Sequence, residues 1–233
     1  MIDIHCHILP GVDDGPESLE QSLAMARLAV ADGITTIVAT PHLLGIVPTA
    51  ETIRTKVDLL NREIMTAGMT LTILPGTEVF ASASPAQLND RTINHTRYLL
   101  VEFPLTHLPA NARQLLFNLK VHEFLPIVAH PERIPSIIAK PDLLDDFQET
   151  SLQITAGSLT GRFGPYVQQC AETLLKKGLV TCIASDAHSA HHRRPRLTEG
   201  MDAAARIIGR EAAERLVLDN PARIIAGDPI QGI

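Results

Sequence analysis

Short apolar segments alternate with amphipathic helical patterns along the whole chain of 233 residues. The strand-like segments cover residues 2–7, 35–40, 70–77, 98–103, 125–130, 152–156 and 180–185. Apolar residues at helical spacing occupy the stretches 19–30, 49–68, 111–122, 141–149, 164–177, 197–209 and 211–218. Strands that are apolar throughout and separated by helices indicate a buried parallel sheet in an α/β domain.

Seven such units can close into a barrel or spread into an open, doubly wound sheet. No glycine-rich phosphate loop follows the first strand-like segment, which weakens the dinucleotide-binding type of open sheet. Polar residues end nearly every strand, and a barrel gathers all those ends at one mouth. The sequence therefore predicts a TIM-like (β/α)7 barrel. Because it contains no linker, repeat or low-complexity tract, it predicts a single domain over residues 1–233.

The first strand-like segment carries His5 and His7. In an extended segment alternate side chains share a face, so both imidazoles point the same way while Cys6 points to the other face. Two neighbouring imidazoles suit a transition-metal ion, although an isolated pair would fit satisfied core or surface histidines equally well. The pair gains weight because similar side chains follow the later strands.

Polar residues follow one strand after another at nearly the same offset. They are His5, His7, His42, Glu78, Glu102, His130, Asp186 and His188, joined by Asp13 or Asp14 in the loop after the first strand. A buried carboxylate or imidazole is costly unless it is paired or metal-bound. Nine ligands exceed the need of one catalytic zinc, which uses about three protein ligands. The set predicts two or three divalent ions, and mixed nitrogen and oxygen ligation suits manganese, iron or zinc.

Composition excludes several other functions. With a formal charge of −6 the chain has no basic stripe to neutralise phosphates, so nucleic acid and anionic membranes are excluded as main partners. No apolar run reaches the roughly 18–20 residues that span a bilayer, and no signal-peptide pattern precedes the first strand. Three cysteines without zinc-type spacing predict no disulfides. We therefore expect a cytoplasmic location without membrane insertion.

The motifs around these residues resemble those of the PHP (polymerase and histidinol phosphatase) superfamily. Asp-Ile-His-Cys-His is followed by Val-Asp-Asp-Gly-Pro, Thr-Pro-His, Gly-Thr-Glu, Ala-His-Pro-Glu-Arg and Ser-Asp-Ala-His. More closely, the whole chain resembles the bacterial metal-dependent protein-tyrosine phosphatases found with capsule and exopolysaccharide genes. The resemblance implies a distorted seven-stranded barrel with three divalent ions, manganese being the expected metal. It also implies a tyrosine autokinase of capsule assembly as the phosphorylated partner.

The resemblance further implies how the ligands divide among three ions. The first ion would be held by His5, His7, Glu78 and Asp186, the second by Asp14, His42 and His188, and the third by Glu78, Glu102 and His130. The family pattern selects Asp14, which directly precedes Gly-Pro, over Asp13.

Two arginine segments lie close to ligand positions in the sequence. Arg133 is three residues past His130, and Arg193 and Arg194 follow the last ligand position. Guanidinium groups bind phosphate through paired hydrogen bonds. The resemblance favours Arg133 and Arg194, because Arg194 and Pro195 reproduce the Arg-Pro step of the family.

Clustered metals beside arginines predict phosphomonoester hydrolysis. Metal ions lower the pKa of bound water and stabilise the entering and leaving oxygens, so we expect a metal-bridging hydroxide to attack phosphorus directly. His42 or a nearby acid would assist the leaving tyrosine. A cysteine-based phosphatase needs an arginine six residues after its cysteine, whereas Val12, Lys176 and His188 occupy those positions here.

Three other functions stay open from the sequence alone. A phosphatase of the same fold acting on histidinol phosphate or a nucleotide would have an almost identical metal site. An amidohydrolase-type C–N hydrolase also begins with His-x-His, although many of these enzymes carry a strand-end lysine where this chain has Glu102. A metal-binding domain without catalysis would be expected to lack ligands, and none is missing. The oligomeric state is not determined by the sequence.

Overall fold

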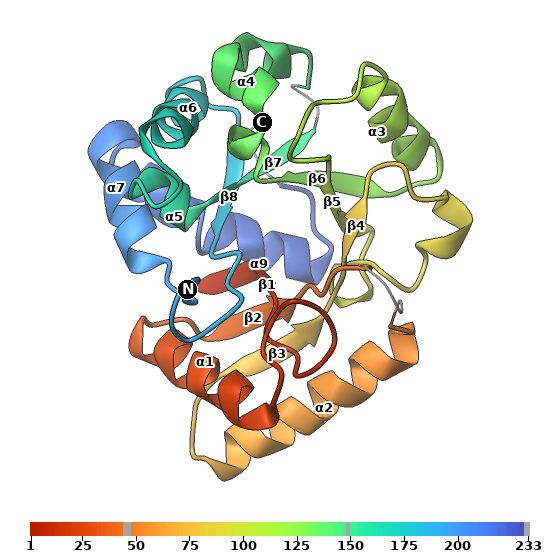
Figure 1. The fold of residues 1–233 in the computed structure, drawn as a ribbon, viewed down its shortest axis with the longest axis vertical. Helices are drawn as coiled ribbons and strands as arrows, with labels where there is room; N and C mark the ends of the chain where they lie inside the picture. The colour runs from red at the N-terminus through yellow and green to blue at the C-terminus, as the bar shows by residue number, and fades with distance from the viewer. Residues whose placement is uncertain (44–47, 148–149, 231–233) are drawn as a thin grey trace.

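The computed structural model describes residues 1–43, 48–147 and 150–230 as an α/β fold in which neighbouring strands run parallel (Figure 1). Within these residues the strands are β1 (Ile2–Cys6), β2 (Thr36–Ala39), β3 (Thr72–Pro75), β4 (Glu78–Phe80), β5 (Tyr98–Glu102), β6 (Leu125–Ala129), β7 (Ser151–Thr155) and β8 (Val180–Ala184). All seven predicted strand positions are confirmed, and β4 is an additional strand. The chain leaves β3 at Gly76, where a Cβ would come within 2.7 Å of Val38 Cγ1.

Helices cover the outside of the strands in Figure 1, with α1 and α2 beside β1–β3 and α3, α6 and α7 beside β5–β8. The α-helices are α1 (Leu19–Ala31), α2 (Ala50–Thr66), α3 (Ala112–Val121), α4 (Pro135–Ala139), α5 (Ala156–Leu159), α6 (Pro165–Lys176), α7 (Thr198–Ile208), α8 (Arg210–Arg215) and α9 (Asp219–Ala226). Short 3₁₀ helices are η1 (Pro85–Gln87), η2 (Ile93–His95), η3 (Pro131–Arg133) and η4 (Pro141–Phe147). The side chains of Ser18 and Thr49 cap α1 and α2 by accepting a hydrogen bond from the backbone N–H of the third residue of each helix.

Two helical predictions differ from the structure. The helix expected over 141–149 is the 3₁₀ helix η4, and residues 148–149 lie outside the described residues. The helix α9 follows the predicted elements and was not expected. Its Pro221 lies in the first turn, where a missing N–H costs no helical hydrogen bond.

The strands form two sheets, in the order β1-β2-β3 and β4-β5-β6-β7-β8. Isolated parallel bridges join the sheets at two places, one between Cys6 and Ala187 and the other between His42 and Glu78. The α/β class with parallel strands is confirmed, whereas closure into the expected (β/α)7 barrel stays a prediction, because the described residues form two parallel sheets with eight strands. None of the helices in that part of the chain is long and apolar enough to cross a membrane.

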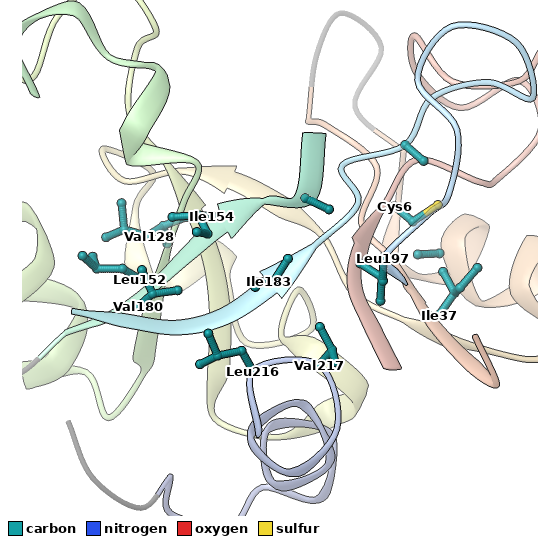
Figure 2. Packing of buried hydrophobic residues seen from close by; sticks show 14 of the residues in the cluster. Cys6, Ile37, Val128, Leu152, Ile154, Val180, Ile183, Leu197, Leu216 and Val217 are labelled. Carbon is teal, nitrogen blue, oxygen red and sulfur yellow. The ribbon is translucent and has the colours of Figure 1, made fainter. Parts of the chain in front are cut away.

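Two hydrophobic clusters hold the strands and helices together. The larger cluster continues from Leu152 and Val180, past Ile183, to Cys6 and Ile37, so it packs against strands of both sheets (Figure 2). The smaller cluster combines strand residues of both sheets with Ile224 of α9, a helix that packs on β1 and β8. Because both clusters span the two sheets, the strand ends of one sheet are fixed relative to those of the other.

The loop before α7 is tied down by a residue from α1's C-terminal end. Asp32 Oδ2 accepts hydrogen bonds from the backbone N–H groups of Leu197, at 2.6 Å, and Thr198, at 3.0 Å. Replacing Asp32 by alanine leaves both amides without this acceptor, so we expect Asp32→Ala to lower the free energy of unfolding by about 1–2 kcal/mol. Urea denaturation measures the change, with Asp58→Ala, at an exposed position of α2, as the matched control. Equal stability of the two variants would contradict the role of Asp32.

Candidate metal centre

The carboxyl ends of the strands bring all nine predicted metal-binding residues together. Parallel strands present these ends at one edge, which explains why side chains far apart in sequence meet. Their ligand atoms fall into four overlapping groups, within each of which the atoms lie within 4.8 Å of one another. The groups are His7, Asp14, His42 and His188; His5, His130 and Asp186; His5, His7 and Glu78; and His42, Glu78 and Glu102.

This grouping differs in part from the division expected from the resemblance. Asp14, His42 and His188 lie together as expected, with His7 beside them. Asp186 is grouped with His5 and His130, although its Oδ1 is also 3.7 Å from His7 Nε2. Glu102 lies with His42 and Glu78 rather than with His130. The division of the nine residues among separate ions therefore stays a prediction.

The backbone at the site joins the two sheets. The N–H of Asp186 donates to the carbonyl of His5, and the N–H of His7 donates to the carbonyl of Ala187, both at 2.8 Å. At the other junction the Glu78 N–H donates to the carbonyl of Pro41 at 3.2 Å. The segments that carry candidate ligands are thus the segments that connect the sheets.

Two of the strand-end residues have left-handed backbone conformations. His130 has φ of 35° and Asp186 has φ of 50°. Non-glycine residues adopt this region at a cost, and such strain gathers at functional sites. At both positions the chain turns sharply after its strand, which directs the side chain across the mouth instead of along the sheet.

Acceptors behind the first two histidines fix their orientation. The Nδ1 atom of His5 lies 2.8 Å from Gln153 Oε1, and the Nδ1 atom of His7 lies 2.6 Å from Asp13 Oδ2. Each Nδ1 therefore donates a proton to an outer acceptor, and the two Nε2 atoms, 3.2 Å apart, are left facing the carboxylates. Metal-binding histidines are oriented in this way by a carboxylate or carbonyl on the other ring nitrogen.

Glu78 lies at the centre of the site and is completely buried. Its Oε1 is 2.9 Å from His130 Nε2. Its Oε2 is 3.1 Å from His5 Nε2, 3.3 Å from His7 Nε2 and 3.2 Å from His42 Nδ1. One carboxylate thus contacts four imidazoles, which makes Glu78 the residue best placed to bridge two ions.

Asp186 connects the histidines to two arginines. Its Oδ1 lies 3.4 Å from His5 Nε2. Its Oδ2 accepts a hydrogen bond from Arg133 at 2.6 Å and also contacts Arg193. The arginine that follows, Arg194, is exposed and donates from Nε to a backbone carbonyl. Of the two neighbouring arginines, Arg193 is therefore the one that contacts a candidate ligand, while the assignment of phosphate binding to Arg194 stays a prediction.

The electrostatics of the site favour a cation. Burial disfavours ionised Glu78, but His5, His130 and His7 outweigh burial and hold its pKa well below the ordinary range. Burial also opposes protonation of His7, yet Asp13 and Glu78 raise its pKa to about 10. The two shifts have complementary causes, because the imidazoles lower the pKa of Glu78 and the carboxylates raise that of His7. A metal ion among the carboxylates can replace the protons that the histidines hold.

The pKa of His188 is shifted in the opposite direction to that of His7. Burial, with the nearby positive charges of His7 and Arg193, lowers the pKa of His188 to about 3. A neutral imidazole is the form that binds a metal. Asp14, whose side chain is 58% exposed, lies 3.3 Å from His188 Nε2, while Asp13 remains behind His7.

Comparison with known proteins identifies the family. Residues 1–226 match the family described as capsular polysaccharide synthesis, CpsB/CapC. The chain belongs to the CpsB/CapC family. It is 41% identical over 201 residues to the tyrosine-protein phosphatase YwqE of Bacillus subtilis, covering 83% of this chain and 79% of the relative. It is 29% identical to the tyrosine-protein phosphatase CpsB of Streptococcus pneumoniae, covering 97% and 98% of the two chains.

A solved structure agrees with this membership. The chain superposes with a TM-score of 0.92 and 34% identity on a structure described with YwqE and CpsB as unique metal-dependent tyrosine phosphatases, covering 99% of this chain and 96% of that one. The histidinol phosphate phosphatase of Lactococcus lactis, at 14% identity and a TM-score of 0.52, shares the fold alone.

The nine donors in this CpsB/CapC chain fit divalent metal ions. Four of the nine side chains are carboxylates and five are imidazoles, a donor set that suits manganese, iron or zinc. Several of their atoms are buried without a hydrogen-bond partner in the described residues, namely His42 Nδ1, Glu78 Oε2, His130 Nδ1 and His188 Nε2. Buried polar atoms are nearly always paired, so these atoms call for further partners, and at Glu78 Oε2, His42 Nδ1 and His188 Nε2 a cation would supply one.

Gln153 and Glu132 were not among the predicted site residues, and Arg193 was named only as the alternative to Arg194. Gln153 is a completely buried polar residue within the apolar strand β7, and that anomaly in the sequence is the signal for it. Glu132, also completely buried, accepts hydrogen bonds from the Thr155 N–H and the Ser158 hydroxyl. It ties the segment after β6 to the end of β7, next to the site.

Asp3 is a buried carboxylate beside the CpsB/CapC metal centre. Its Oδ1 accepts hydrogen bonds from the backbone N–H groups of His5 and Ser185, at 3.3 and 3.0 Å, and its Oδ2 has no partner in the described residues. Burial raises the pKa of Asp3 to about 6, although the hydrogen bonds from Ser185 and His5 favour the carboxylate. Below about pH 6 the native state therefore favours protonated Asp3.

This raised pKa predicts a pH-dependent stability. Below about pH 4 Asp3 is protonated in both states and costs nothing, whereas stability is lost as the pH rises toward 6 and the buried group ionises. The loss is about 3 kcal/mol above pH 6, so the stability of Asp3→Asn relative to wild type should increase between pH 4 and 7. Urea denaturation of chelated protein across this range measures the difference, with Asp58→Asn as control. A difference that stays constant with pH would contradict the prediction.

Proposed function

We propose that this chain is a metal-dependent protein-tyrosine phosphatase that hydrolyses phosphotyrosine on a protein substrate. The observation that carries the proposal is a cluster of nine imidazole and carboxylate side chains with two arginines against one of its carboxylates. Membership of the CpsB/CapC family supports it, because curated members are named tyrosine-protein phosphatases. Guanidinium groups beside a metal cluster suit a phosphate ester better than an amide.

The nine residues would hold three divalent ions, with manganese as the metal we expect and iron or zinc as the alternatives. The ligands would be His5, His7, Asp14, His42, Glu78, Glu102, His130, Asp186 and His188. When bound, such ions lower the pKa of water and neutralise the charge on phosphoryl oxygens. Gln153 and Asp13 would keep His5 and His7 in the tautomer that leaves Nε2 free.

The arginines would orient the phosphate. Arg133 is held from two sides, by Asp186 and by the ring of Phe163, whose centroid lies 4.6 Å from its guanidinium carbon. Arg193 contacts the same Asp186 oxygen from another loop. Two guanidinium groups fixed in this way present paired donors to the non-bridging oxygens.

The leaving group needs little help from the protein. A tyrosyl phenolate has a pKa of about 10, so it departs with little protonation. His42 is the most exposed imidazole of the cluster, at 14%. As a metal ligand it would be neutral, so a proton for the tyrosyl oxygen would come from water.

A cysteine nucleophile does not fit the described residues. Cys6, Cys170 and Cys182 are all buried. Burial raises the pKa of each thiol, that of Cys170 to about 12, which leaves almost no thiolate at neutral pH. The reaction then proceeds by direct attack of water on phosphorus, without a phosphocysteine.

We infer three further features of the protein, which concern its fold, its substrate and its location. The two sheets would close into one distorted barrel through the bridges at Cys6–Ala187 and His42–Glu78. The substrate would be a tyrosine autokinase of capsule or exopolysaccharide assembly, in keeping with the family. Such a reaction would take place in the cytoplasm.

Metal dependence tests the proposed function. Chelated protein should not hydrolyse a phosphotyrosine peptide, and manganese, zinc, iron or magnesium, tested in turn, should show which ion restores turnover. His7→Ala should lose turnover with every metal, because it removes a ligand shared by two groups of the site, while exposed His122→Ala should keep it. Turnover of p-nitrophenyl phosphate without turnover of the peptide would indicate a metabolite phosphatase. Metal binding with neither activity would contradict a phosphatase altogether.

The structure predicts unequal roles for neighbouring arginines. Arg193→Ala should lower kcat/KM for the peptide at least about tenfold more than Arg194→Ala, since Arg193 contacts Asp186 and Arg194 is exposed. Arg193→Lys should recover only part of the loss, because lysine lacks the planar fork. Steady-state kinetics of the loaded enzyme measure both effects. A larger loss at Arg194 would support the sequence interpretation instead.

A further inference from the structure

A pocket of about 260 Å³ adjoins the metal centre and has a strongly basic lining. Its arginines are Arg162, Arg193, Arg194 and Arg196. Thr155, the last residue of β7, and Ser185, which directly precedes Asp186, line it as well. The pocket is therefore a neighbour of the proposed catalytic site and is separate from the nine candidate metal ligands, none of which lines it.

The positive charge of this pocket is only half compensated. Arg193 contacts Asp186, and Arg196 donates to Glu199 Oε1 at 3.1 Å. The other two arginines have no acidic partner in the described part of the chain. Because the protein as a whole carries a net charge of −6, a concave surface with two uncompensated guanidinium groups is a local exception.

The lining also contains polar atoms without partners. Thr155 is 1% exposed, and its hydroxyl makes no hydrogen bond within the described residues. The Nε of Arg193 is likewise buried without an acceptor. Both groups can donate to an oxygen anion, and buried donors are nearly always satisfied in native proteins. The unpaired donors and the excess positive charge both indicate an anionic ligand with oxygen acceptors.

The pocket is built against the residues that orient phosphate. Arg162 lies across Gly157, where a Cβ would come within 3.0 Å of Arg162 Cδ. Phe163, in the lining, lies under the guanidinium of Arg133. One wall of the pocket is therefore in contact with Arg133, the residue proposed to orient the phosphate.

We propose that the arginine pocket is a second anion-binding subsite, which takes a carboxylate or phosphate group of the peptide substrate close to its phosphotyrosine. This inference rests on the proposed function, and it makes the enzyme selective for phosphotyrosine in acidic or multiply phosphorylated segments. Without such a subsite, a protein of net charge −6 would favour neutral or basic flanks, so the predicted order of substrates is the reverse of the order expected from net charge.

Three phosphotyrosine peptides of equal length test the proposal on the metal-loaded enzyme. One has neutral flanks, one has glutamate flanks, and one has a non-hydrolysable phosphonate analogue of phosphotyrosine as its flank. We expect kcat/KM to be about three- to fivefold higher for an anionic flank than for the neutral one, with the advantage falling as salt is raised. A benefit from the phosphonate alone identifies phosphate as the ligand, and a benefit from glutamate identifies a carboxylate.

The double variant Arg162→Gln/Arg196→Gln should remove the advantage of the anionic flanks and leave p-nitrophenyl phosphate and the neutral peptide unchanged. Arg206→Gln, at an exposed position of α7 outside the pocket lining, is the matched control. Equal kcat/KM for all three peptides with wild type, or an equal loss for all three in the double variant, would overturn the subsite.

A binding measurement separates failure of the subsite from failure of the proposed function. Peptides with the phosphonate in place of the central phosphotyrosine are titrated calorimetrically into loaded wild type and the double variant. If wild type hydrolyses no phosphotyrosine peptide, the proposed function fails. Tighter binding of anionic flanks by wild type alone would still support the subsite, and equal binding by both proteins would overturn it.

Discussion

The completely buried carboxylate of Glu78 is the group around which the strand ends are arranged. An ionised carboxylate away from water is stable only when opposite charge and hydrogen bonds surround it. Here four imidazoles, from the ends of β1 and β6 and from the segment after β2, approach its two oxygens. Parallel strands supply that convergence, because their carboxyl ends meet at one edge. The arrangement of the strands and the composition of the site thus both serve to surround the buried charge of Glu78.

Asp186 is a second buried carboxylate that is surrounded by positively charged groups. One of its oxygens faces the histidines and the other faces Arg133 and Arg193, so a single side chain connects the candidate metal centre with the arginines proposed to bind phosphate. A phosphate ester is the substrate that needs both. The surrounding arginines then extend the recognition of anions beyond the reacting phosphate.

Local patterns made much of this predictable. The alternation of strands and helices located every one of the seven predicted strands, and the offset of polar residues after them located the nine candidate ligands. The sequence patterns did not predict contacts between residues that are distant in the chain, such as that of Gln153 with His5, 148 positions apart. Nor could a pattern choose Arg193 over Arg194, since neighbouring loop residues differ only in where the loop points them. The sequence also did not predict that the strand segment 70–77 ends at Pro75 and that a separate strand, β4, begins at Glu78. That division depends on how closely Gly76 approaches Val38 of β2.

The left-handed backbone at His130 and Asp186 restricts which residues can replace them. Asparagine tolerates this conformation better than any other residue with a Cβ, whereas β-branched side chains do not. Asparagine at either position would therefore preserve the turn while altering the donor atoms. An enzyme weakened in this way would keep its shape around a bound phosphopeptide, which makes these two positions the natural choice for capturing a slow or arrested complex.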